Sequence, residues 1–215
     1  MKKPDIIIVD DHLIFRQGLK SLITIENIAT VIAEASDGRE FIDLLGSHKP
    51  DLVLMDIDMP RMNGIEATQK ALELMPELKI IAFTMFGEED YYYKMIDLGV
   101  KGFILKSSGI NELEKAIHDV MMGESYFSNE LLRKIINNFS RKNSHKPAEM
   151  AGLTVRELEV LQQICFGLNN EEIAKKLFIS PNTVKSHRSN LFEKTGCKNT
   201  PGMILFAMKN KIIVV

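Results

Sequence analysis

The chain has 215 residues, enough for two modest domains that each bury their own core. Hydrophobic residues make up 45% of the chain and charged residues 26%, as in ordinary globular proteins. No apolar stretch approaches the roughly 20 residues that span a bilayer, which argues against a membrane protein and predicts a cytoplasmic location. The two cysteines, Cys165 and Cys197, form no metal-binding pattern and favour a reducing compartment.

Charge is divided unevenly along the chain at about Tyr126. Residues 1–125 carry 13 Lys and Arg against 22 Asp and Glu, a net charge of −9, whereas residues 126–215 carry 14 against 7, a net charge of +7. The overall net charge of −2 conceals this division. Concentrated carboxylates suit a hard cation, and a basic domain suits the phosphates of nucleic acid.

The first half alternates short apolar runs with helical patterns. Strands are predicted near residues 5–10, 29–35, 51–56, 79–84 and 102–105, with helices between and after them. Such alternation is typical of an α/β domain in which right-handed crossovers build a parallel sheet. We therefore expect a five-stranded parallel sheet in residues 1–125.

Five reactive side chains stand at the ends of four of these strands: Asp10, Asp11, Asp56, Thr84 and Lys106. The carboxyl ends of parallel strands share one edge, where ligands of open α/β sheets bind. Neighbouring carboxylates repel one another unless a cation neutralises them, and oxygen ligands favour Mg2+. Asp56 is then suited to attack a phosphoryl donor, while Lys106 absorbs negative charge and Thr84 bonds to the acyl phosphate. A single acidic strand end is common, so the prediction depends on all five positions together.

The motifs around these side chains resemble the receiver domain of bacterial two-component response regulators. The matching segments are ValAspAspHis at 9–12, MetAspIleAspMetProArgMetAsnGly at 55–64, PheThr at 83–84 and GlyPheIleLeuLys at 102–106. The resemblance covers residues 4 to about 122. It implies a flavodoxin-like (βα)5 fold whose activity depends on phosphoryl transfer from a sensor histidine kinase.

The same resemblance implies a role for each reactive residue. Asp56 is the implied phosphoacceptor. The implied Mg2+ ligands are Asp10, Asp11, Asp56 and the backbone carbonyl of Asp58. Thr84 and Lys106 match the switch hydroxyl and the phosphate-binding lysine, and Phe103 takes the aromatic switch position.

Three positions depart from the usual receiver pattern. Lys106 is followed by Ser107 and not by proline, so no cis peptide bond is predicted there. Phe103 stands where the best-known receivers have tyrosine, so switching would depend on ring packing without a phenol hydrogen bond. Met85 is bulky where many receivers have a small residue, and we expect it to restrict access to Asp56.

An alternative function is a Mg2+-dependent phosphatase that turns over through an aspartyl phosphate. The segment AspIleAsp at 56–58 superficially fits the two-aspartate motif of haloacid-dehalogenase-type enzymes. The glycine and threonine expected after that motif are absent, and the acidic pair precedes the nucleophile strand instead of following it. We therefore expect a regulator and not an enzyme; multiple turnover of a phosphomonoester would favour the alternative.

Residues 126–150 are predicted to form a linker that contains a short amphipathic helix. Apolar residues recur from Leu131 to Phe139, and the polar run SerArgLysAsnSerHisLysPro follows them. The linker is either a passive tether or a segment that packs on a domain and regulates it. The sequence leaves both open.

Residues 151–215 are predicted to form a small all-α domain. Thr154 and Glu157 form a capping box at the start of a helix that ends near Gly167, and Asn170 is suited to cap a second helix. Ser180 followed by Pro181 begins a third helix that runs to about Thr195. The second and third helices, joined by a tight turn, predict a helix-turn-helix.

The third helix has one apolar and one polar face. Val184, Leu191 and Phe192 share the face expected to pack in the core. Asn182, Lys185, Ser186 and Ser189 point the other way, and small polar side chains of this kind allow a helix to enter the DNA major groove. We expect Arg188, nearer the packed face, to extend its guanidinium to a phosphate.

This region resembles the LuxR-type helix-turn-helix of the NarL/FixJ response regulators. The match runs from Leu153 to about Asn210 through LeuThrValArgGluLeuGluValLeu, AsnAsnGluGluIleAla and IleSerProAsnThrValLysSerHis. It implies double-stranded DNA as a partner. The implied base-facing residues are Lys185, Ser186 and Ser189, and the implied DNA-backbone contacts are Thr183, His187 and Arg188.

The last predicted helix bears on assembly. Met203 to Met208 is apolar at six consecutive positions, after a Thr200 cap and Pro201. Six such positions cover every face of a helix, which is more than one small domain is expected to bury. We therefore predict a homodimer through this helix; packing on the receiver or on the tail from Ile212 to Val215 is the alternative.

Together these patterns predict a phosphorylation-controlled transcription factor. A receiver whose DNA binding is independent of phosphorylation remains an alternative.

Overall fold

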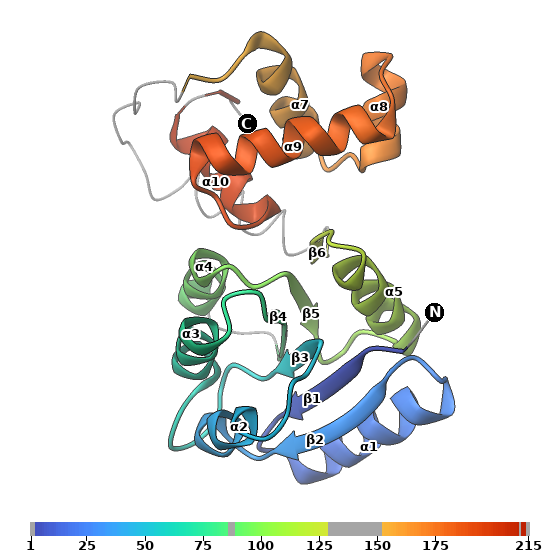
Figure 1. The fold of residues 1–215 in the computed structure, drawn as a ribbon, viewed down its shortest axis with the longest axis vertical. Helices are drawn as coiled ribbons and strands as arrows, with labels where there is room; N and C mark the ends of the chain where they lie inside the picture. Colours follow the sequence, from blue (N-terminus) through green and yellow to red (C-terminus); the bar gives the residue numbers. More distant parts are fainter. Residues whose placement is uncertain (1–2, 86–88, 129–151, 211, 214–215) are drawn as a thin grey trace. The chain divides into compact units, whose positions relative to one another are not determined.

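A computed structural model describes residues 3–85, 89–128, 152–210 and 212–213, with the side chains of residues 84, 89 and 90 also left undescribed. The chain divides between Phe127 and Ser128 into two compact units (Figure 1). The helix predicted around residues 131–139 lies outside the described ranges. None of the described helices is long and apolar enough to cross a membrane.

The first unit is a parallel α/β domain. Its elements are β1 (Asp5–Val9), α1 (Leu13–Ile25), β2 (Thr30–Ala35), α2 (Gly38–Leu45), β3 (Leu52–Met55), α3 (Gly64–Leu74), β4 (Lys79–Thr84), α4 (Glu89–Leu98), β5 (Gly102–Leu105), α5 (Ile110–Met121) and β6 (Tyr126–Phe127). The strands lie in the order β2-β1-β3-β4-β5-β6, and each neighbouring pair is parallel. The predicted parallel α/β fold is confirmed.

The sheet has one strand more than the five we predicted. Tyr126 and Phe127 pair with Gly102 and Phe103 of β5, so the predicted linker begins with a sixth strand. A two-residue strand is too short to show a periodicity of two in its sequence, which explains why it was missed.

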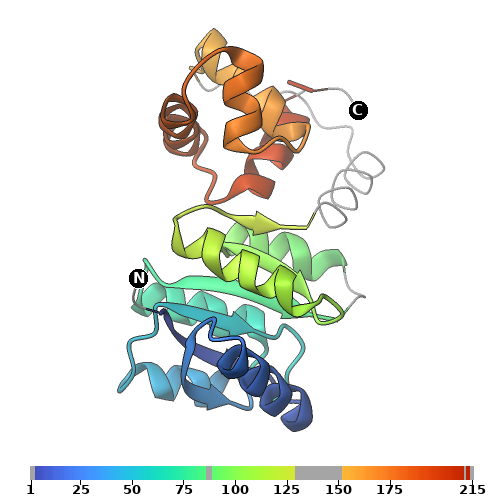
Figure 2. The same cartoon turned by 90° about the vertical axis from the view of Figure 1, so that its right-hand side faces the viewer.

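Helices cover both faces of this sheet. Helices α1 and α5 lie on one face, toward the viewer in Figure 2, and α2, α3 and α4 lie on the other (Figure 1). Leu19 and Ile23 of α1 pack with Ile117 of α5 on residues of four central strands, among them Ile8 and Leu54. Burial on both faces explains why β1, β3 and β5 are apolar at nearly every position.

The second unit contains α7 (Val155–Cys165), α8 (Asn170–Leu177), α9 (Pro181–Thr195) and α10 (Thr200–Lys209). The predicted capping box of Thr154 and Glu157 is present, and Ser180 caps α9 with Pro181 in its first turn. Two predicted caps were wrong by one residue, because Asn169 caps α8 and Asn199 caps α10. In both cases the neighbouring residue, Asn170 or Thr200, is already the first residue of the helix.

Helix α10 buries most of its apolar residues within its own domain. Met203, Ile204, Leu205 and Ala207 are all buried. Ile212 and Ile213 of the tail pack against the same core. Phe206 and Met208 of the same run remain half-buried, so the domain covers most of this run but not all of it, and a homodimer through this helix stays a prediction.

Candidate phosphoacceptor site and DNA-binding helix

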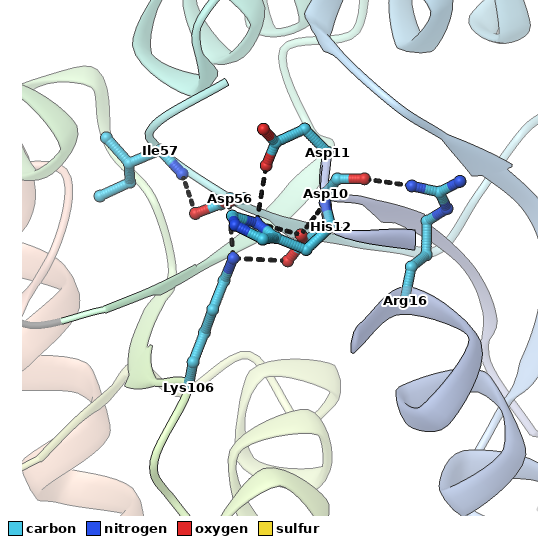
Figure 3. Close-up of polar contacts among 7 residues, drawn as sticks. All are labelled: Asp10, Asp11, His12, Arg16, Asp56, Ile57 and Lys106. Atoms are coloured by element: carbon cyan, nitrogen blue, oxygen red, sulfur yellow. Dashed lines mark hydrogen bonds and ion pairs between the residues drawn. The ribbon is translucent and has the colours of Figure 1, made fainter. Parts of the chain in front are cut away.

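Three of the predicted reactive residues meet at the carboxyl edge of the sheet. Asp10 follows β1, Asp56 follows β3, and Lys106 follows β5. The Lys106 ammonium nitrogen lies 2.7 Å from an Asp10 carboxylate oxygen and 2.6 Å from an Asp56 carboxylate oxygen (Figure 3). All three side chains are at most 4% exposed. Parallel pairing of β1 with β3, and of β3 with β5 through β4, brings these side chains together.

The backbone around Asp56 is held on both sides. The Asp56 N–H donates to the Val9 carbonyl at 2.9 Å, and the Gly64 N–H donates to the Ile57 carbonyl at 2.8 Å. A Cβ atom at Gly64 would lie 1.9 Å from the Asp56 carbonyl oxygen, so only glycine fits there. The Ile57 N–H also donates to Asp56 Oδ1 at 2.8 Å, which leaves Oδ2 facing Lys106.

Burial and charge act against each other in this site. Burial raises the pKa of Asp56, although the hydrogen bond and the positive charge of Lys106 oppose that shift. For Lys106, burial favours the neutral amine, but hydrogen bonds from its ammonium to Asp10 and Asp56 outweigh burial and raise its pKa. Lys106 is therefore a stable cation in this site.

The acidic pair after β1 extends this site. Ligand atoms of Asp10, Asp11, His12 and Asp56 all lie within 4.8 Å of one another. Asp11 Oδ1 is shielded from solvent and accepts no hydrogen bond from the described residues, although His12 Nδ1 lies 2.8 Å from it. A shielded carboxylate oxygen of this kind suits a hard cation. His12 is 65% exposed, as expected of a surface histidine at a helix start.

Fewer contacts are described for the other predicted receiver residues. Thr84 ends β4 and pairs with Leu105, but its side chain is not among those described. Phe103 is buried, and its ring contacts the ring edge of Tyr92 at a centroid distance of 4.9 Å. Asp58 is exposed. Met85 is 67% exposed, so most of its side chain faces solvent, and its effect on access to Asp56 stays a prediction.

Phe15 was not among the site residues predicted from the sequence, but its ring lies beside this site. The Lys106 nitrogen lies 5.0 Å from the centroid of the Phe15 ring, and this ring packs against Phe83. An aromatic residue on an amphipathic helix carries no signal that separates such a contact from ordinary core packing.

In the second unit, α9 exposes the polar face that its sequence predicts. Val184 and Leu191 are buried. The exposed predicted DNA contacts are Asn182, Thr183, Lys185, Ser186 and Ser189, and His187 is half-buried. Arg188 is half-buried, and its guanidinium donates to Asn170 Oδ1 at 3.2 Å and to Thr200 Oγ1 at 2.8 Å. A phosphate contact by Arg188 would compete with these hydrogen bonds.

Each of the two units matches a known protein family. Residues 6–118 match the family described as "Response regulator receiver domain", and residues 151–207 match "Bacterial regulatory proteins, luxR family". The chain belongs to the response regulator family. It is therefore a two-component response regulator with a receiver domain and a LuxR-type DNA-binding domain, and it acts as a transcription factor.

Several relatives extend over nearly the whole chain. The oxygen regulatory protein NreC of Staphylococcus aureus is 37% identical over 213 residues, which covers 97% of this chain and 98% of NreC. The crystal structure of ChrA, the response regulator of a heme-sensing two-component system, is 31% identical with a TM-score of 0.55 and covers 99% of this chain and 100% of ChrA. RcsB of Salmonella enterica serovar Typhimurium, bound to the promoter rprA with the phosphomimetic BeF3−, is 26% identical with a TM-score of 0.58 and covers 96% of this chain and 98% of RcsB.

Proposed function

We propose that Asp56 accepts a phosphoryl group from a sensor histidine kinase and that its phosphorylation controls binding of α9 to DNA. The observation that carries this proposal is the contact of the Lys106 ammonium with both Asp10 and Asp56 at the sheet edge. A buried nucleophilic carboxylate beside a stable cation is suited to phosphoryl transfer, because that reaction requires compensation of negative charge.

Mg2+ is the proposed cofactor. Asp10, Asp11, Asp56 and the backbone carbonyl of Asp58 are the residues that would hold it. The carboxylate donor set and the shielded Asp11 Oδ1 fit a hard cation. When bound, Mg2+ would supply positive charge that offsets repulsion between the carboxylates and the incoming phosphoryl group.

In the proposed reaction, an Asp56 carboxylate oxygen attacks the phosphorus of the phosphohistidine donor. The new bond joins that oxygen to phosphorus, the bond from phosphorus to the donor imidazole nitrogen breaks, and that nitrogen recovers a proton from solvent. Lys106 stands close enough to Asp56 to neutralise charge that develops during transfer. We propose that the Thr84 hydroxyl and Phe103 respond to the acyl phosphate afterwards.

We propose that the phosphorylated chain pairs on double-stranded DNA in the cytoplasm. Lys185, Ser186 and Ser189 are the proposed base contacts, with Asn182, Thr183 and His187 beside them; Arg188 is a weaker candidate because of its hydrogen bonds inside the domain. Two RcsB dimers bound to two DNAs, 25% identical with a TM-score of 0.60, support pairing on DNA. Sedimentation of phosphorylated and unphosphorylated protein tests the dimer, since equal dimer constants would contradict it.

The experiment that tests the phosphoacceptor is intact-mass spectrometry after incubation with acetyl phosphate and Mg2+. We expect the wild type to gain one phosphoryl group and Asp56→Asn to gain none. Asp58→Asn is the matched control, because it removes a nearby exposed carboxylate without touching the acceptor. A gain in Asp56→Asn equal to the wild type would refute the assignment, and no gain in the wild type would favour DNA binding that is independent of phosphorylation.

A further inference from the structure

The turn between α8 and α9 contains an aromatic residue in an unusual backbone conformation. Phe178 has φ 56° and ψ 45°, in the left-handed region, and its side chain is 94% exposed. Glycine, asparagine and aspartate populate this region readily, whereas bulky side chains there are uncommon and strained. Phe178 lies in the connection from α8 to α9, and α9 is the proposed recognition helix that enters the DNA groove (Figure 1).

The surrounding backbone fixes this conformation. The N–H groups of Phe178 and Ile179 both donate to the Ala174 carbonyl, the latter at 3.0 Å. Leu177 and Ile179, on either side of Phe178, pack against the core of the domain. Since its neighbours face the core, the Phe178 ring is directed to solvent and makes little contribution to packing.

The position of this ring relative to α9 indicates what it contacts. Ser180 caps α9 and accepts from the Thr183 N–H at 3.0 Å. Phe178 is two residues before this cap, so its Cα lies within about 7 Å of that of Ser180. In a helix-turn-helix the first residues of the recognition helix approach the DNA. Phe178 therefore lies close to the end of α9 that would approach DNA.

The charge around the turn favours DNA over a protein surface as the occupant. Lys175 is exposed in the last turn of α8, three residues before Phe178, and the neighbouring Lys176 lies over the Phe166 ring. The half of the chain that contains them has 14 Lys and Arg against 7 Asp and Glu. An exposed aromatic ring in a basic domain fits a surface that combines phosphates with apolar sugar carbons and thymine methyl groups.

We propose that Phe178 is a DNA-contacting residue whose ring packs on a deoxyribose or a thymine methyl group beside the recognition helix. This inference rests on DNA binding through α9. A DNA contact explains why this strained position has an exposed aromatic side chain, since a residue that favours the left-handed region would form the turn equally well.

The test measures binding of the full chain, with acetyl phosphate and Mg2+ in every sample, to a labelled duplex selected from a random pool by the wild type. Phe178→Asn removes the ring and tolerates the backbone conformation. We expect it to raise Kd about tenfold, as loss of a base-edge or sugar contact does, and to leave the thermal midpoint unchanged. Phe178→Tyr keeps the ring and is expected to stay within about twofold of the wild type.

Phe166→Asn is the matched control. Phe166 is also an exposed phenylalanine, 71% exposed, but it follows α7 and its ring contacts Lys176. We expect this variant to bind the duplex as the wild type does. An equal loss in both variants would overturn the proposal, because it would reflect general loss of exposed apolar surface.

Two further outcomes would also overturn the proposal. Wild-type affinity in Phe178→Asn would exclude a DNA contact and favour a protein partner for this ring. Weak binding together with a lower thermal midpoint would show that Phe178 is structural. Lys185→Ala separates this proposal from the proposed function: weaker binding in Lys185→Ala with unchanged binding in Phe178→Asn would refute the Phe178 contact alone.

Discussion

Lys106 holds two buried carboxylates together at the sheet edge, at 2.7 Å from Asp10 and 2.6 Å from Asp56. Removing one partner of a buried ion pair commonly costs roughly 3–5 kcal/mol, because the remaining charge stays poorly hydrated. We expect Lys106→Met to lower the free energy of unfolding by about 3 kcal/mol without Mg2+. The loss should be smaller with Mg2+, since a cation on the same carboxylates replaces the ammonium. Urea unfolding followed by tyrosine fluorescence measures this, as all 4 tyrosines lie in residues 91–126.

Lys20→Met is the matched control for this prediction. Lys20 lies 2.6 Å from Glu34, and the two side chains are 48% and 23% exposed. Exposed pairs of this kind contribute about 1 kcal/mol or less. We therefore expect a small loss that does not depend on Mg2+. A Mg2+-dependent gain in stability that is equal in the wild type and in Lys106→Met would contradict the role given to Lys106.

A glycine fixes the loop after the phosphoacceptor. We expect Gly64→Ala to lower the free energy of unfolding by roughly 1–3 kcal/mol and to slow phosphorylation, because its Cβ would lie 1.9 Å from the Asp56 carbonyl oxygen. Gly18→Ala is the control, because a Cβ there meets nothing within 4 Å. In the interior of α1, alanine is expected to be more stable than glycine by about 0.5–1 kcal/mol. Urea unfolding and the rate of mass gain with acetyl phosphate measure both variants. Normal stability and rate in Gly64→Ala would show that the loop can move.

At the scale of the elements, Glu157 joins two helices of the DNA-binding domain. It completes the capping box of α7 and lies 2.8 Å from Lys194 of α9. The hydrogen bond from Lys194, reinforced by the Thr154 N–H, lowers the pKa of Glu157 from 4.5 to about 2. A carboxylate whose pKa is lower in the folded state stabilises the fold above its unfolded pKa and loses that contribution as pH falls through its folded pKa. We expect the stabilisation from Glu157 to be complete above about pH 5 and to decline toward pH 2.

Calorimetry of the full chain between pH 7 and pH 3 measures this contribution. In Glu157→Gln, the transition of the DNA-binding domain should begin lower and depend less on pH than in the wild type. Glu172→Gln is the control, because Glu172 forms the same kind of capping box with Asn169 on α8 but is exposed. The same pH dependence in Glu157→Gln as in the wild type would rule out the contribution of Glu157.

The elements of this chain were predictable where their signal is local. The apolar runs that became β1, β3 and β5 and the caps Thr154 and Ser180 depend on residues close in sequence. The sixth strand was not predictable, because Tyr126 pairs only through the register that β5 presents. Asn169 and Asn199 show a further limit of sequence patterns: two adjacent residues can both cap a helix, and packing selects one of them.

Contacts between distant segments were the least predictable part of the site. The sequence placed Asp10, Asp56 and Lys106 at one sheet edge, because parallel topology aligns strand ends. It did not predict that Arg188 would bond to Asn170 and Thr200, since both partners lie in other helices. A long basic side chain at the edge of a packed face is equally compatible with a phosphate contact and with a bond inside the domain.

At the scale of the whole molecule, the charge division predicts how DNA binding responds to salt. A domain that neutralises DNA phosphates releases counterions, so its affinity falls linearly with the logarithm of salt concentration. Lys185 is exposed on the polar face of α9. We expect Lys185→Ala to reduce the magnitude of this slope by about one, because one phosphate or base-edge cation is lost. Fluorescence anisotropy with a labelled duplex at several salt concentrations measures the slope.

Two control variants distinguish a local contact from the net charge of the domain. Lys209→Ala removes the same charge from the exposed end of α10, away from α9 in sequence. Its slope should stay close to that of the wild type, because counterion release depends on the number of phosphates that the protein contacts and not on its total charge. Ser186→Ala should also keep the slope but weaken the preference between duplexes, since a hydroxyl reads bases without neutralising phosphate. Equal slopes for Lys185→Ala and Lys209→Ala would mean that the positive charge of the domain attracts DNA as a whole and that α9 is not the contacting surface.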